Sequence, residues 1–426
     1  MAYRNRVADD ILNDKLNSFG GVLIEGPKGC GKTTTAKEHA KSFIEFQDED
    51  LRDNYLLIAD THPSDLLKGE KPRLFDEWQD APKIWGAVRK SIDDEQKTGL
   101  YILTGSSSNN VVTPHTGTLR ISRMKMLPMS LYESGDSNGE VSLIDLFNNP
   151  NVFPVCESNL TIDDLKFVIC RGGWPGSLIP KDKKSQLNIA KDLYKQTYSV
   201  DISNIDHITR NPKLTQLILK SYARNICTLA TSSTLYEDVK ANIDISKQTY
   251  YDYIQALEKL YMIEDLEAWS PSIRSKTGIR SGHKRNFMDP SIAVAALGIS
   301  PEYFDSDYVT LGFLFESLCI RDLKIYSSKY NGTVSYYHDR YDLEADAVLM
   351  LEDGRYALIE IKLGQKGIEE GAKHLLEIEK LIKEYNDKKP QHPLRIPDLK
   401  IVLTGTQYGH RREDGVFVIP IGCLKD

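Results

Sequence analysis

The segment from Gly26 to Thr33 constrains the fold of this chain most strongly, because it matches the phosphate-binding pattern G-x-x-x-x-G-K-[ST] at every position. Residues 22–24 are apolar and predict a short buried strand before it, and residues 34–43 predict a helix after it. Glycines in such a turn let backbone N–H groups point at a phosphate, and the helix N-terminus adds partial positive charge. The segment therefore predicts a P-loop.

The predicted P-loop implies ATP and Mg²⁺ as cofactors. Lys32 is expected to reach the β- and γ-phosphates, and the hydroxyl of Thr33 is expected to bind Mg²⁺. The residues expected to contact the nucleotide are Gly26, Pro27, Lys28, Gly29, Cys30, Gly31, Lys32, Thr33 and Thr34. The alternative is a glycine-rich turn that only matches the motif, and the flanking strand and helix argue against it.

Two further predicted strands deliver polar side chains to the same site. Residues 73–79 place Asp76 and Glu77 after an apolar run, where Asp76 is expected to join the Mg²⁺ shell and Glu77 to polarise the attacking water. Residues 100–103 form the other strand, and Ser106, beyond its end, is expected to contact the γ-phosphate or the water. An acidic pair usually lies on a solvated surface, but the position of this pair after a P-loop favours a functional role.

The order of these parts resembles the AAA-type ATPases, in which the strand after the acidic pair ends in a polar sensor and an arginine precedes the next strand. It is similar in particular to a prokaryotic branch that carries a C-terminal domain of unknown function and commonly has Gly-Arg before a segment like residues 127–133. Here Leu119 stands in place of that glycine. The resemblance implies that Arg120 is an arginine finger, with Arg123 as the alternative, and that the protein forms a homo-oligomer. Otherwise the two arginines lie on a solvated strand edge.

The resemblance also implies an α/β fold built from four parts. These are an AAA-type P-loop ATPase core (1–135), a helical lid and connector (136–210), a winged-helix-like domain (211–290) and an α/β restriction-endonuclease-like domain (291–426). The sequence pattern agrees with the third part, because it predicts helices over 214–227 and 234–241 and a third helix capped by Ser246. Residues 261–266 then have the pattern of the first strand of a wing.

Within a chain of formal net charge −7, residues 270–286 stand out because they contain no acidic residue and five basic ones, Arg274, Lys276, Arg280, Lys284 and Arg285. This local reversal of charge predicts contact with the phosphate backbone of DNA. Winged helices also serve as protein-contact modules, and a basic loop is often only solvated. DNA and a protein are therefore both expected partners of this part of the chain.

A second group of charged residues lies on a predicted β-hairpin near the C-terminus. Residues 344–351 alternate like a strand, Gly354 lies in the turn, and residues 355–362 form the returning strand. A three-residue loop pairs Leu351 with Arg355, whereas a two-residue loop gives a different register. The turn therefore decides which charges face each other.

The three-residue loop sets Asp346 opposite Glu360 and sets Glu344 opposite Lys362, with all four charges on one face. Asp followed by Glu-x-Lys on the neighbouring strand resembles the PD-(D/E)xK nuclease fold. The resemblance implies that Asp346 and Glu360 bind a divalent metal and that Lys362 stabilises charge at a phosphate. It also places a glutamate on the preceding helix, where Glu316 lies. The alternative is a ladder of charges at a sheet surface.

The length of 426 residues allows roughly two to four domains, and 40% hydrophobic with 27% charged residues is ordinary for a globular protein. No window approaches the ~20 apolar residues that span a bilayer, and the N-terminus lacks an apolar signal core, so we expect a cytoplasmic protein without a membrane partner. The six cysteines are scattered without a C-x-x-C pair, which predicts reduced and mostly buried thiols.

Two functions follow from these patterns. The first is an ATP-hydrolysing AAA-type ATPase coupled to a DNA-acting winged-helix and nuclease-like module. The alternative is a nucleotide-switched regulator or remodeller that binds a protein and whose nuclease-like fold is catalytically inactive. The joint presence of Asp346, Glu360 and Lys362 favours the first.

Overall fold

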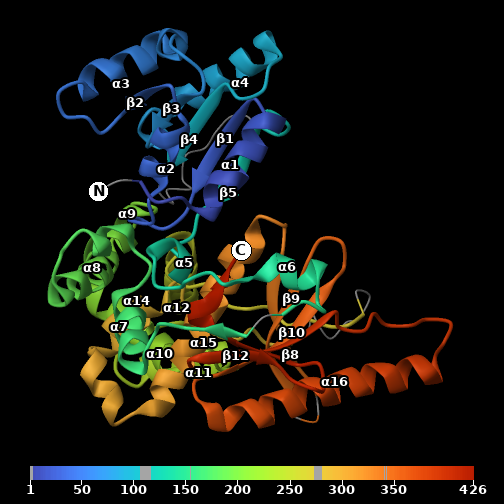
Figure 1. Cartoon of the computed structure of the whole chain (residues 1–426). Coiled ribbons are helices and arrows are strands. Elements are labelled where there is room, and N and C mark those ends of the chain that lie inside the picture. Colours follow the sequence, from blue (N-terminus) through green and yellow to red (C-terminus); the bar gives the residue numbers. More distant parts are fainter. Residues whose placement is uncertain (1–2, 106–116, 154, 273–280, 340, 342) are drawn as a thin grey trace.

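The computed structural model of the chain describes residues 3–105, 117–153, 155–272, 281–339, 341 and 343–426. Figure 1 shows the N-terminal part, in blue and cyan, at one end of the molecule and the rest of the chain, in green to red, at the other. The N-terminal part contains a five-stranded sheet, and the C-terminal part contains a seven-stranded sheet. The six cysteines are all free and buried, as predicted.

The N-terminal sheet has the order β2-β3-β4-β1-β5, and its strands run parallel. Along its central strand, Val22 and Ile24 pack into one core cluster while Leu23 packs into another, so both faces of the sheet are covered. The strands are β1 (Gly21–Glu25), β2 (Ser42–Glu45), β3 (Arg73–Asp76), β4 (Tyr101–Gly105) and β5 (Ile121–Lys125). The helices of this part are α1 (Val7–Ser18), α2 (Lys32–His39), α3 (Arg52–Thr61) and α4 (Lys83–Glu95).

The middle of the chain is mainly helical. Ser246 caps α12 by accepting a hydrogen bond from the backbone N–H of Thr249, as predicted. After α12 the chain makes two antiparallel bridges, Ile263 with Phe287 and Leu266 with Lys284. The helices of the middle part are α5 (Leu131–Ser134), α6 (Leu143–Asn148), α7 (Ile162–Arg171), α8 (Lys183–Gln196), α9 (Ile202–Asn204), α10 (Pro212–Arg224), α11 (Ser232–Lys240), α12 (Lys247–Lys259) and α14 (Pro290–Leu297), with a 3-10 turn η3 (Pro175–Leu178) and a π-helical turn η4 (Thr197–Asp201).

The C-terminal sheet has the order β7-β12-β13-β11-β10-β9-β8. Helix α16 packs with Val348, Val402 and Val418 in one core cluster, whereas α15 packs with Leu349 and Ile401 in another, so the sheet lies between these two long helices. The elements are α15 (Tyr308–Ser328), β8 (Thr333–His338), β9 (Glu344–Met350), β10 (Tyr356–Lys362), α16 (Ile368–Lys388), β11 (Leu399–Thr404), β12 (Tyr408–Arg411), β13 (Phe417–Pro420) and β14 (Leu424–Lys425).

The predicted connector over residues 136–210 is not helical throughout. Within it, β6 (Val141–Ser142) pairs with β14, and β7 (Cys156–Glu157) pairs with β12. The side chain of Ser137 also donates a hydrogen bond of 2.7 Å to the carbonyl oxygen of Leu424. Within the first third of the connector, β7 therefore joins the C-terminal sheet, and β6 forms a separate two-stranded sheet with β14, so that extended backbone satisfies its hydrogen bonds there.

The C-terminal hairpin has the predicted three-residue loop. Met350 pairs with Tyr356 and Ala347 pairs with Ile359, and the backbone N–H of Leu351 donates to the carbonyl oxygen of Arg355 at 2.8 Å. Gly354 has φ of +84°, the left-handed conformation that this turn requires. Across the described part of the chain, no helix is both long enough and apolar enough to cross a membrane.

Candidate functional site

Three glycines shape the loop between β1 and α2. Gly29 and Gly31 have φ of +77° and +104°, which side chains disfavour, and Gly31 is the residue that precedes α2. A Cβ atom on Gly26 would lie 2.2 Å from the carbonyl oxygen of Met126. The loop therefore has the compact backbone that a phosphate-binding turn needs, at the N-terminus of a helix.

The predicted lysine lies inside this loop. Lys32 is buried, and its Nζ atom donates hydrogen bonds of 2.9 Å to the carbonyl oxygens of both Gly26 and Pro27. Its ammonium is thus held against the backbone of the loop. This arrangement suits the binding of a negatively charged phosphate group.

The predicted Mg²⁺ residues lie next to each other. Thr33 Oγ1 donates to Asp76 Oδ1 at 2.7 Å, and Thr104 Oγ1, on β4, donates to the same oxygen at 2.5 Å. Burial raises the pKa of Asp76, and the hydrogen bonds from Thr104 and Thr33 oppose that rise. A hydroxyl and a carboxylate are oxygen ligands of the kind that Mg²⁺ takes, so the residues present fit this ion.

Glu77 follows Asp76 in an unusual backbone conformation, with φ of +53°. Its N–H donates to Thr104 Oγ1 at 3.3 Å, and its carboxylate accepts a short hydrogen bond from Gln79. Left-handed conformations of residues other than glycine are costly and cluster at functional sites. Ser106, the other predicted polar residue of this site, lies outside the described residues.

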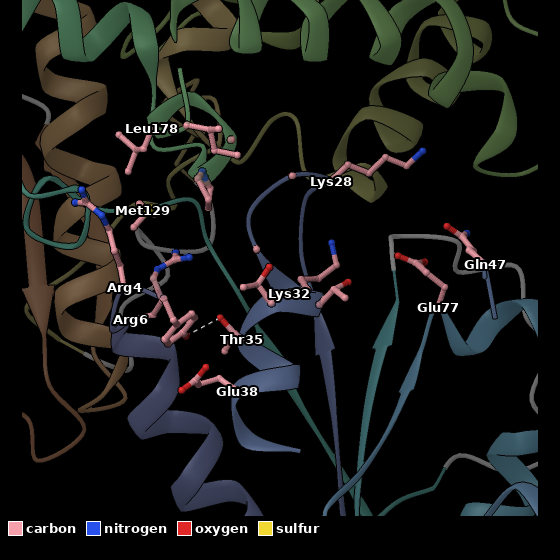
Figure 2. Close-up of a pocket in the computed structure, with 18 residues that line it drawn as sticks. Arg4, Arg6, Lys28, Lys32, Thr35, Glu38, Gln47, Glu77, Met129 and Leu178 are labelled. Carbon is pink, nitrogen blue, oxygen red and sulfur yellow. Dashed lines mark hydrogen bonds between the residues drawn. The ribbon is translucent and has the colours of Figure 1, made fainter. Parts of the chain in front are cut away.

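A cavity of about 910 Å³ opens above the P-loop. Figure 2 shows Arg4 and Arg6 on one side of it, Gln47 and Glu77 on the other, and Lys32 between them. Its walls come from the N-terminal segment, the P-loop, α2 and the turn η3. The lining residues are Tyr3, Arg4, Arg6, Lys28, Gly29, Gly31, Lys32, Thr33, Thr34, Thr35, Glu38, Gln47, Glu77, Met129, Pro175, Gly176, Leu178 and Ile179.

Arg6 ties the N-terminal segment to the P-loop. Its guanidinium donates to the carbonyl oxygens of Cys30 at 3.0 Å and Leu127 at 2.9 Å, and its Nε lies 3.2 Å from Glu133 Oε1. Glu133 in turn accepts a hydrogen bond from the backbone N–H of Ser130, which caps α5. The conformation of the loop is therefore coupled to the segment that follows β5.

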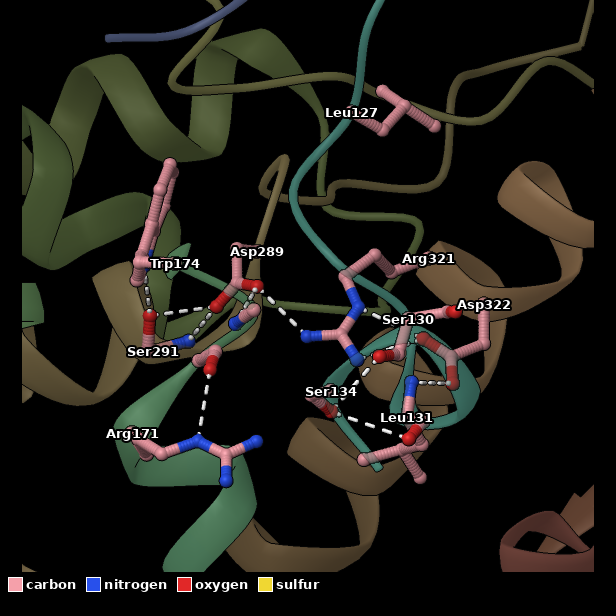
Figure 3. Close-up of polar contacts among 12 residues, drawn as sticks. Leu127, Ser130, Leu131, Ser134, Arg171, Trp174, Asp289, Ser291, Arg321 and Asp322 are labelled. Carbon is pink, nitrogen blue, oxygen red and sulfur yellow. Dashed lines mark hydrogen bonds and ion pairs between the residues drawn. The ribbon is translucent and has the colours of Figure 1, made fainter. Parts of the chain in front are cut away.

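The turn Arg171–Gly176 links the P-loop to the C-terminal half. The carbonyl oxygen of Gly173 accepts from the N–H of Met129 at 2.6 Å, and the N–H of Gly173 donates to Asp289 Oδ2 at 2.9 Å. The indole Nε1 of Trp174 donates to Ser291 Oγ at 2.9 Å, as Figure 3 shows. The Trp174 ring also lies close to the P-loop, since a Cβ atom on Gly29 would be 3.9 Å from it.

Arg321, on α15, is the centre of the polar network in Figure 3. It contacts Asp289 Oδ2 at 2.8 Å and Asp322 Oδ1 at 2.7 Å, and all three side chains are buried. Asp322 also accepts a hydrogen bond of 2.9 Å from the backbone N–H of Leu131, just beyond β5. The network therefore joins the N-terminal part, the turn that carries Trp174 and the helix α15.

The predicted charges of the C-terminal hairpin also come together. Lys362 Nζ lies 2.6 Å from Glu360 Oε2 and 3.7 Å from Asp346 Oδ2, and these carboxyl groups are buried. Lys284 Nζ lies 2.6 Å from Glu316 Oε1 and 3.7 Å from Asp346 Oδ1. Glu316, on α15, thus joins the cluster by its ion pair with Lys284. The sequence pattern had predicted that Lys284 contacts DNA.

Burial dominates the titration of this cluster. It raises the pKa of Glu316 to about 7, against the opposing effect of Lys284. Burial and the neighbouring Asp346 raise the pKa of Glu360 to about 8. Burial alone lowers the pKa of Lys284, but Glu316 and Asp346 outweigh it and raise that pKa above its usual value. The lysine therefore stays charged.

The interpretation of residues 270–286 as one exposed basic stretch is wrong for its last two basic residues. Lys284 and Arg285 are buried, and Arg285 lies 2.5 Å from Asp265. Both side chains satisfy internal carboxylates and are withdrawn from a nucleic-acid backbone. Arg274, Lys276 and Arg280 lie outside the described residues.

Models of protein families match three successive parts of the chain. A family described as an AAA domain matches residues 18–134, which include the P-loop, the acidic pair and all five strands of the parallel sheet. The chain contains an AAA-type ATPase domain. Two families described as domains of unknown function (DUF8612 and DUF4143) match residues 162–303 and 311–424. A search of curated proteins gave no match.

Three solved structures match this chain at low similarity. A Walker-type ATPase of Pyrococcus abyssi is 13% identical, with a TM-score of 0.42 over 69% of this chain and 96% of that chain. A variant of Thermotoga maritima RuvB is 14% identical, with a TM-score of 0.27 over 60% and 87%. A signal-transduction ATPase of Pyrococcus horikoshii with a tetratricopeptide repeat sensor is 13% identical, with a TM-score of 0.24 over 77% and 50%. These scores are too low to carry an argument.

In the AAA-type domain, Arg120 lies far from the P-loop of its own chain. It directly precedes β5, whose Ile121 pairs with Gly21 at the beginning of β1, whereas the P-loop follows the end of this five-residue strand. At ~3.3 Å per residue the two are separated by roughly 16 Å. Arg120 contacts Asp93 at 2.8 Å and is partly exposed, and Arg123 contacts Glu25 at 2.7 Å.

Leu119, which directly precedes Arg120, lies in a turn with a left-handed backbone. Its φ is +67°, a left-handed conformation, and its side chain is exposed. Glycine adopts this conformation without a steric cost. A leucine at this position therefore carries a steric cost that a glycine would not.

Sequence reasoning missed several residues of these sites. Arg6 and His374, which lies 3.5 Å from Glu360, were missed because their partners are distant in sequence, and Lys284 was assigned to DNA for the same reason. The contacts of Trp174 with the P-loop and Ser291 had no local signal. Of these residues, Thr104 was the one that a sequence pattern could have assigned to the site of Asp76, because it is a polar residue near the end of the apolar strand β4.

Proposed function

We propose that the AAA-type domain hydrolyses ATP with Mg²⁺ held by Thr33 and Asp76. The observation that carries this proposal is the 2.7 Å contact between Thr33 Oγ1 and Asp76 Oδ1, which puts a P-loop hydroxyl beside a strand-end carboxylate. When bound, Mg²⁺ neutralises charge that develops on the phosphates. Glu77 lines the same cavity and is the proposed general base, while Lys32 binds phosphate oxygens.

The nucleoside has an apolar wall available in this cavity. Met129, Leu178 and Ile179 line it, and Figure 2 shows Met129 and Leu178 across the P-loop from Glu77. An aromatic base that covers such surface gains hydrophobic free energy. We therefore place the base against η3 and the phosphates in the P-loop.

The nucleotide cycle is proposed to act on the C-terminal half through the turn that carries Trp174. This turn borders the cavity with Pro175 and Gly176, and its Gly173 is hydrogen-bonded to Asp289. Asp289 contacts Arg321 on α15, so a movement of η3 displaces a buried ion pair. Packed cores respond to such displacements in discrete steps, which makes the turn a suitable transmission element.

The ATPase proposal is tested by ATP turnover at several Mg²⁺ concentrations. Lys32→Ala is expected to abolish nucleotide binding, and Asp76→Asn is expected to raise the Mg²⁺ concentration needed for turnover. Lys37→Ala is the matched control, because Lys37 also lies on α2 but contacts Glu45 on the surface. Full turnover by Lys32→Ala would overturn the proposal.

A second copy of the chain is proposed to complete the ATPase site. Arg120 lies at the opposite end of the strands from its own P-loop and is partly exposed, which supports a finger role toward a neighbouring protomer. An arginine at this distance has no route to the phosphates of its own chain. The proposed assembly is therefore a homo-oligomer.

For the C-terminal half we propose a winged-helix unit followed by a nuclease-like domain, in the four-part division stated above, with DNA as the partner. The order α10, α11, α12 and the two bridges after α12 support the winged helix. The hairpin register and the gathering of Glu316, Asp346, Glu360 and Lys362 support the nuclease-like domain.

One observation favours the second candidate, a nucleotide-switched binding protein whose nuclease-like fold is inactive. Lys284 contacts two of the carboxylates that a metal would need. The experiment is Mg²⁺- or Mn²⁺-dependent cleavage of linear, single-stranded and branched DNA, with and without ATP. Cleavage that Lys362→Ala loses would establish the nuclease, whereas no cleavage of any substrate supports the binding protein.

A further inference from the structure

Lys284 is fixed in the C-terminal cluster by its backbone as well as by its side chain. Its N–H and carbonyl oxygen both pair with Leu266, at 3.0 and 2.8 Å, in the bridge after α12. The next residue, Arg285, is held by Asp265 at 2.5 Å. These backbone hydrogen bonds and the ion pair of Arg285 therefore hold Lys284 in place beside the cluster.

The position of the ammonium conflicts with a metal ion. Oxygen ligands surround Mg²⁺ or Ca²⁺ at about 2.0–2.6 Å. Lys284 Nζ lies 2.6 Å from Glu316 Oε1, and the two oxygens of Asp346 each face a lysine at 3.7 Å, Lys284 on one side and Lys362 on the other. The residues as they lie thus do not fit a divalent metal. In the described ranges, no group of three or more His, Cys, Asp and Glu side chains is arranged to hold one.

Two lysines offset most of the carboxylate charge of the cluster. Three buried carboxyl groups, on Glu316, Asp346 and Glu360, face the buried ammonium group of Lys284 and the partly exposed one of Lys362. One surplus negative charge remains when all three are ionised. His374 Nδ1, which lies 3.5 Å from Glu360 Oε1, is a further basic group beside that carboxyl. Buried ionic groups persist only when paired in this way.

We propose that the ammonium group of Lys284 takes the place of the divalent metal as a built-in cation. The cluster then connects the segment after α12 to the C-terminal sheet. It does not hydrolyse phosphodiesters. The inference rests on the proposed nuclease-like fold and selects its inactive form. Lys284 belongs to the segment matched by DUF8612, whereas its partners Glu316 and Asp346 belong to the segment matched by DUF4143. The ion pairs therefore bind two family modules together.

The test is Mn²⁺ binding to the full chain without nucleotide, followed by electron paramagnetic resonance of the free ion. Wild type and Asp346→Asn are expected to bind the same amount of Mn²⁺, because the cluster takes none. Lys284→Met is expected to gain one Mn²⁺ per chain, and Lys284→Met with Asp346→Asn is expected to lose it again. Lys324→Met, which removes a partly buried lysine from its carboxylate partner Glu264, is the matched control without a gain.

Two results of the Mn²⁺ measurement would overturn the inference. One is an Asp346-dependent Mn²⁺ site in the wild type, which needs no variant to fold. The other is a folded Lys284→Met chain, checked by circular dichroism and thermal melting with and without Mn²⁺, that gains no ion. If the wild type cleaves DNA and Lys362→Ala does not, the proposal for Lys284 is rejected and the proposal of a nuclease-like fold is retained. ATP turnover of the same preparations tests the ATPase proposal separately.

Discussion

Lys28 Nζ, in the P-loop, lies 2.6 Å from Asp201 Oδ1, in the π-helical turn η4, so an ion pair joins the phosphate-binding loop to the helical part of the chain. The lysine side chain is 48% exposed, whereas the aspartate is 7% exposed. Lys28 also lines the nucleotide cavity. A nucleotide phosphate therefore competes with Asp201 for the same ammonium group.

Asp201→Asn is expected to tighten ATP binding roughly 2- to 5-fold, because releasing a partly exposed ion pair worth about 0.5–1 kcal/mol leaves Lys28 available to the phosphates. The measurement is titration with a fluorescent ATP analogue at low and high salt, and the gain should shrink at high salt. Asp206→Asn is the control, since Asp206 is ion-paired with Arg210 and neither lines the described cavity. Weaker binding by Asp201→Asn would contradict the competition.

Glu77→Gln is expected to bind ATP normally and to hydrolyse it about 10²- to 10⁴-fold more slowly, because the amide no longer accepts a proton from water. The left-handed backbone of Glu77 is unchanged by this substitution, so the fold is retained. ATP affinity and single-turnover hydrolysis separate the two effects. An unchanged rate would assign the base to another residue of the cavity.

Arg120→Ala is expected to leave ATP binding intact and to lower turnover about 10³-fold or more, since an arginine finger acts on the transition state. Turnover per wild-type protomer should rise with protein concentration as the partner subunit supplies the arginine. Mixing Arg120→Ala with Glu77→Gln is expected to restore part of the activity, because each variant supplies what the other lacks. Strict proportionality of activity to protein concentration would show that the ATPase acts as a monomer.

Stability is expected to fall as the pH rises from 5 to 8, in part through Glu360. The folded state raises the pKa of this carboxyl to about 8, whereas the unfolded chain titrates near ~4.3. Between these values the folded state holds a proton that the unfolded state releases, which costs up to ~1.4 kcal/mol per pH unit. Glu316, with a pKa raised to about 7, adds a loss of the same sign.

Glu360→Gln is expected to remove its share of this pH dependence, as measured by the melting temperature at each pH. Glu413→Gln is the control, because Glu413 is exposed and its loss leaves the buried cluster intact. A Glu360→Gln chain with the wild-type slope would show that the proton resides elsewhere, for example between Glu316 and Lys284.

Gly173→Ala is expected to destabilise the protein by ~1–3 kcal/mol, because the added Cβ atom would lie 2.1 Å from the carbonyl oxygen of Met129 and force the turn away from β5. Gly176→Ala, three residues later, is the matched control, since its nearest neighbour would be Ile189 at 3.9 Å. Thermal melting compares the two. Equal melting temperatures would mean that the turn accommodates the added Cβ atom without a loss in the free energy of unfolding.

The sequence by itself determined the nucleotide site and the local elements. The spacing of Gly26, Lys32 and Thr33 fixes a loop whose geometry depends on residues that are neighbours in the chain. Gly354 likewise marked the hairpin turn, and its left-handed conformation in the structure selects the three-residue loop from the two that the sequence allowed. The apolar runs before Glu77 and Thr104 were sufficient for two buried strands.

Only the tertiary structure decided what the charges of the chain do. Lys284 is separated from Glu316 by 32 residues and Arg6 from Leu127 by 121, and no local pattern pairs them. From the sequence, the positive charge of Lys284 predicted a contact with DNA, but the fold buries it against Glu316 and Asp346. The sign of a charge is a property of the residue, whereas its partner depends on which elements the packed core brings together, and burial makes that pairing obligatory.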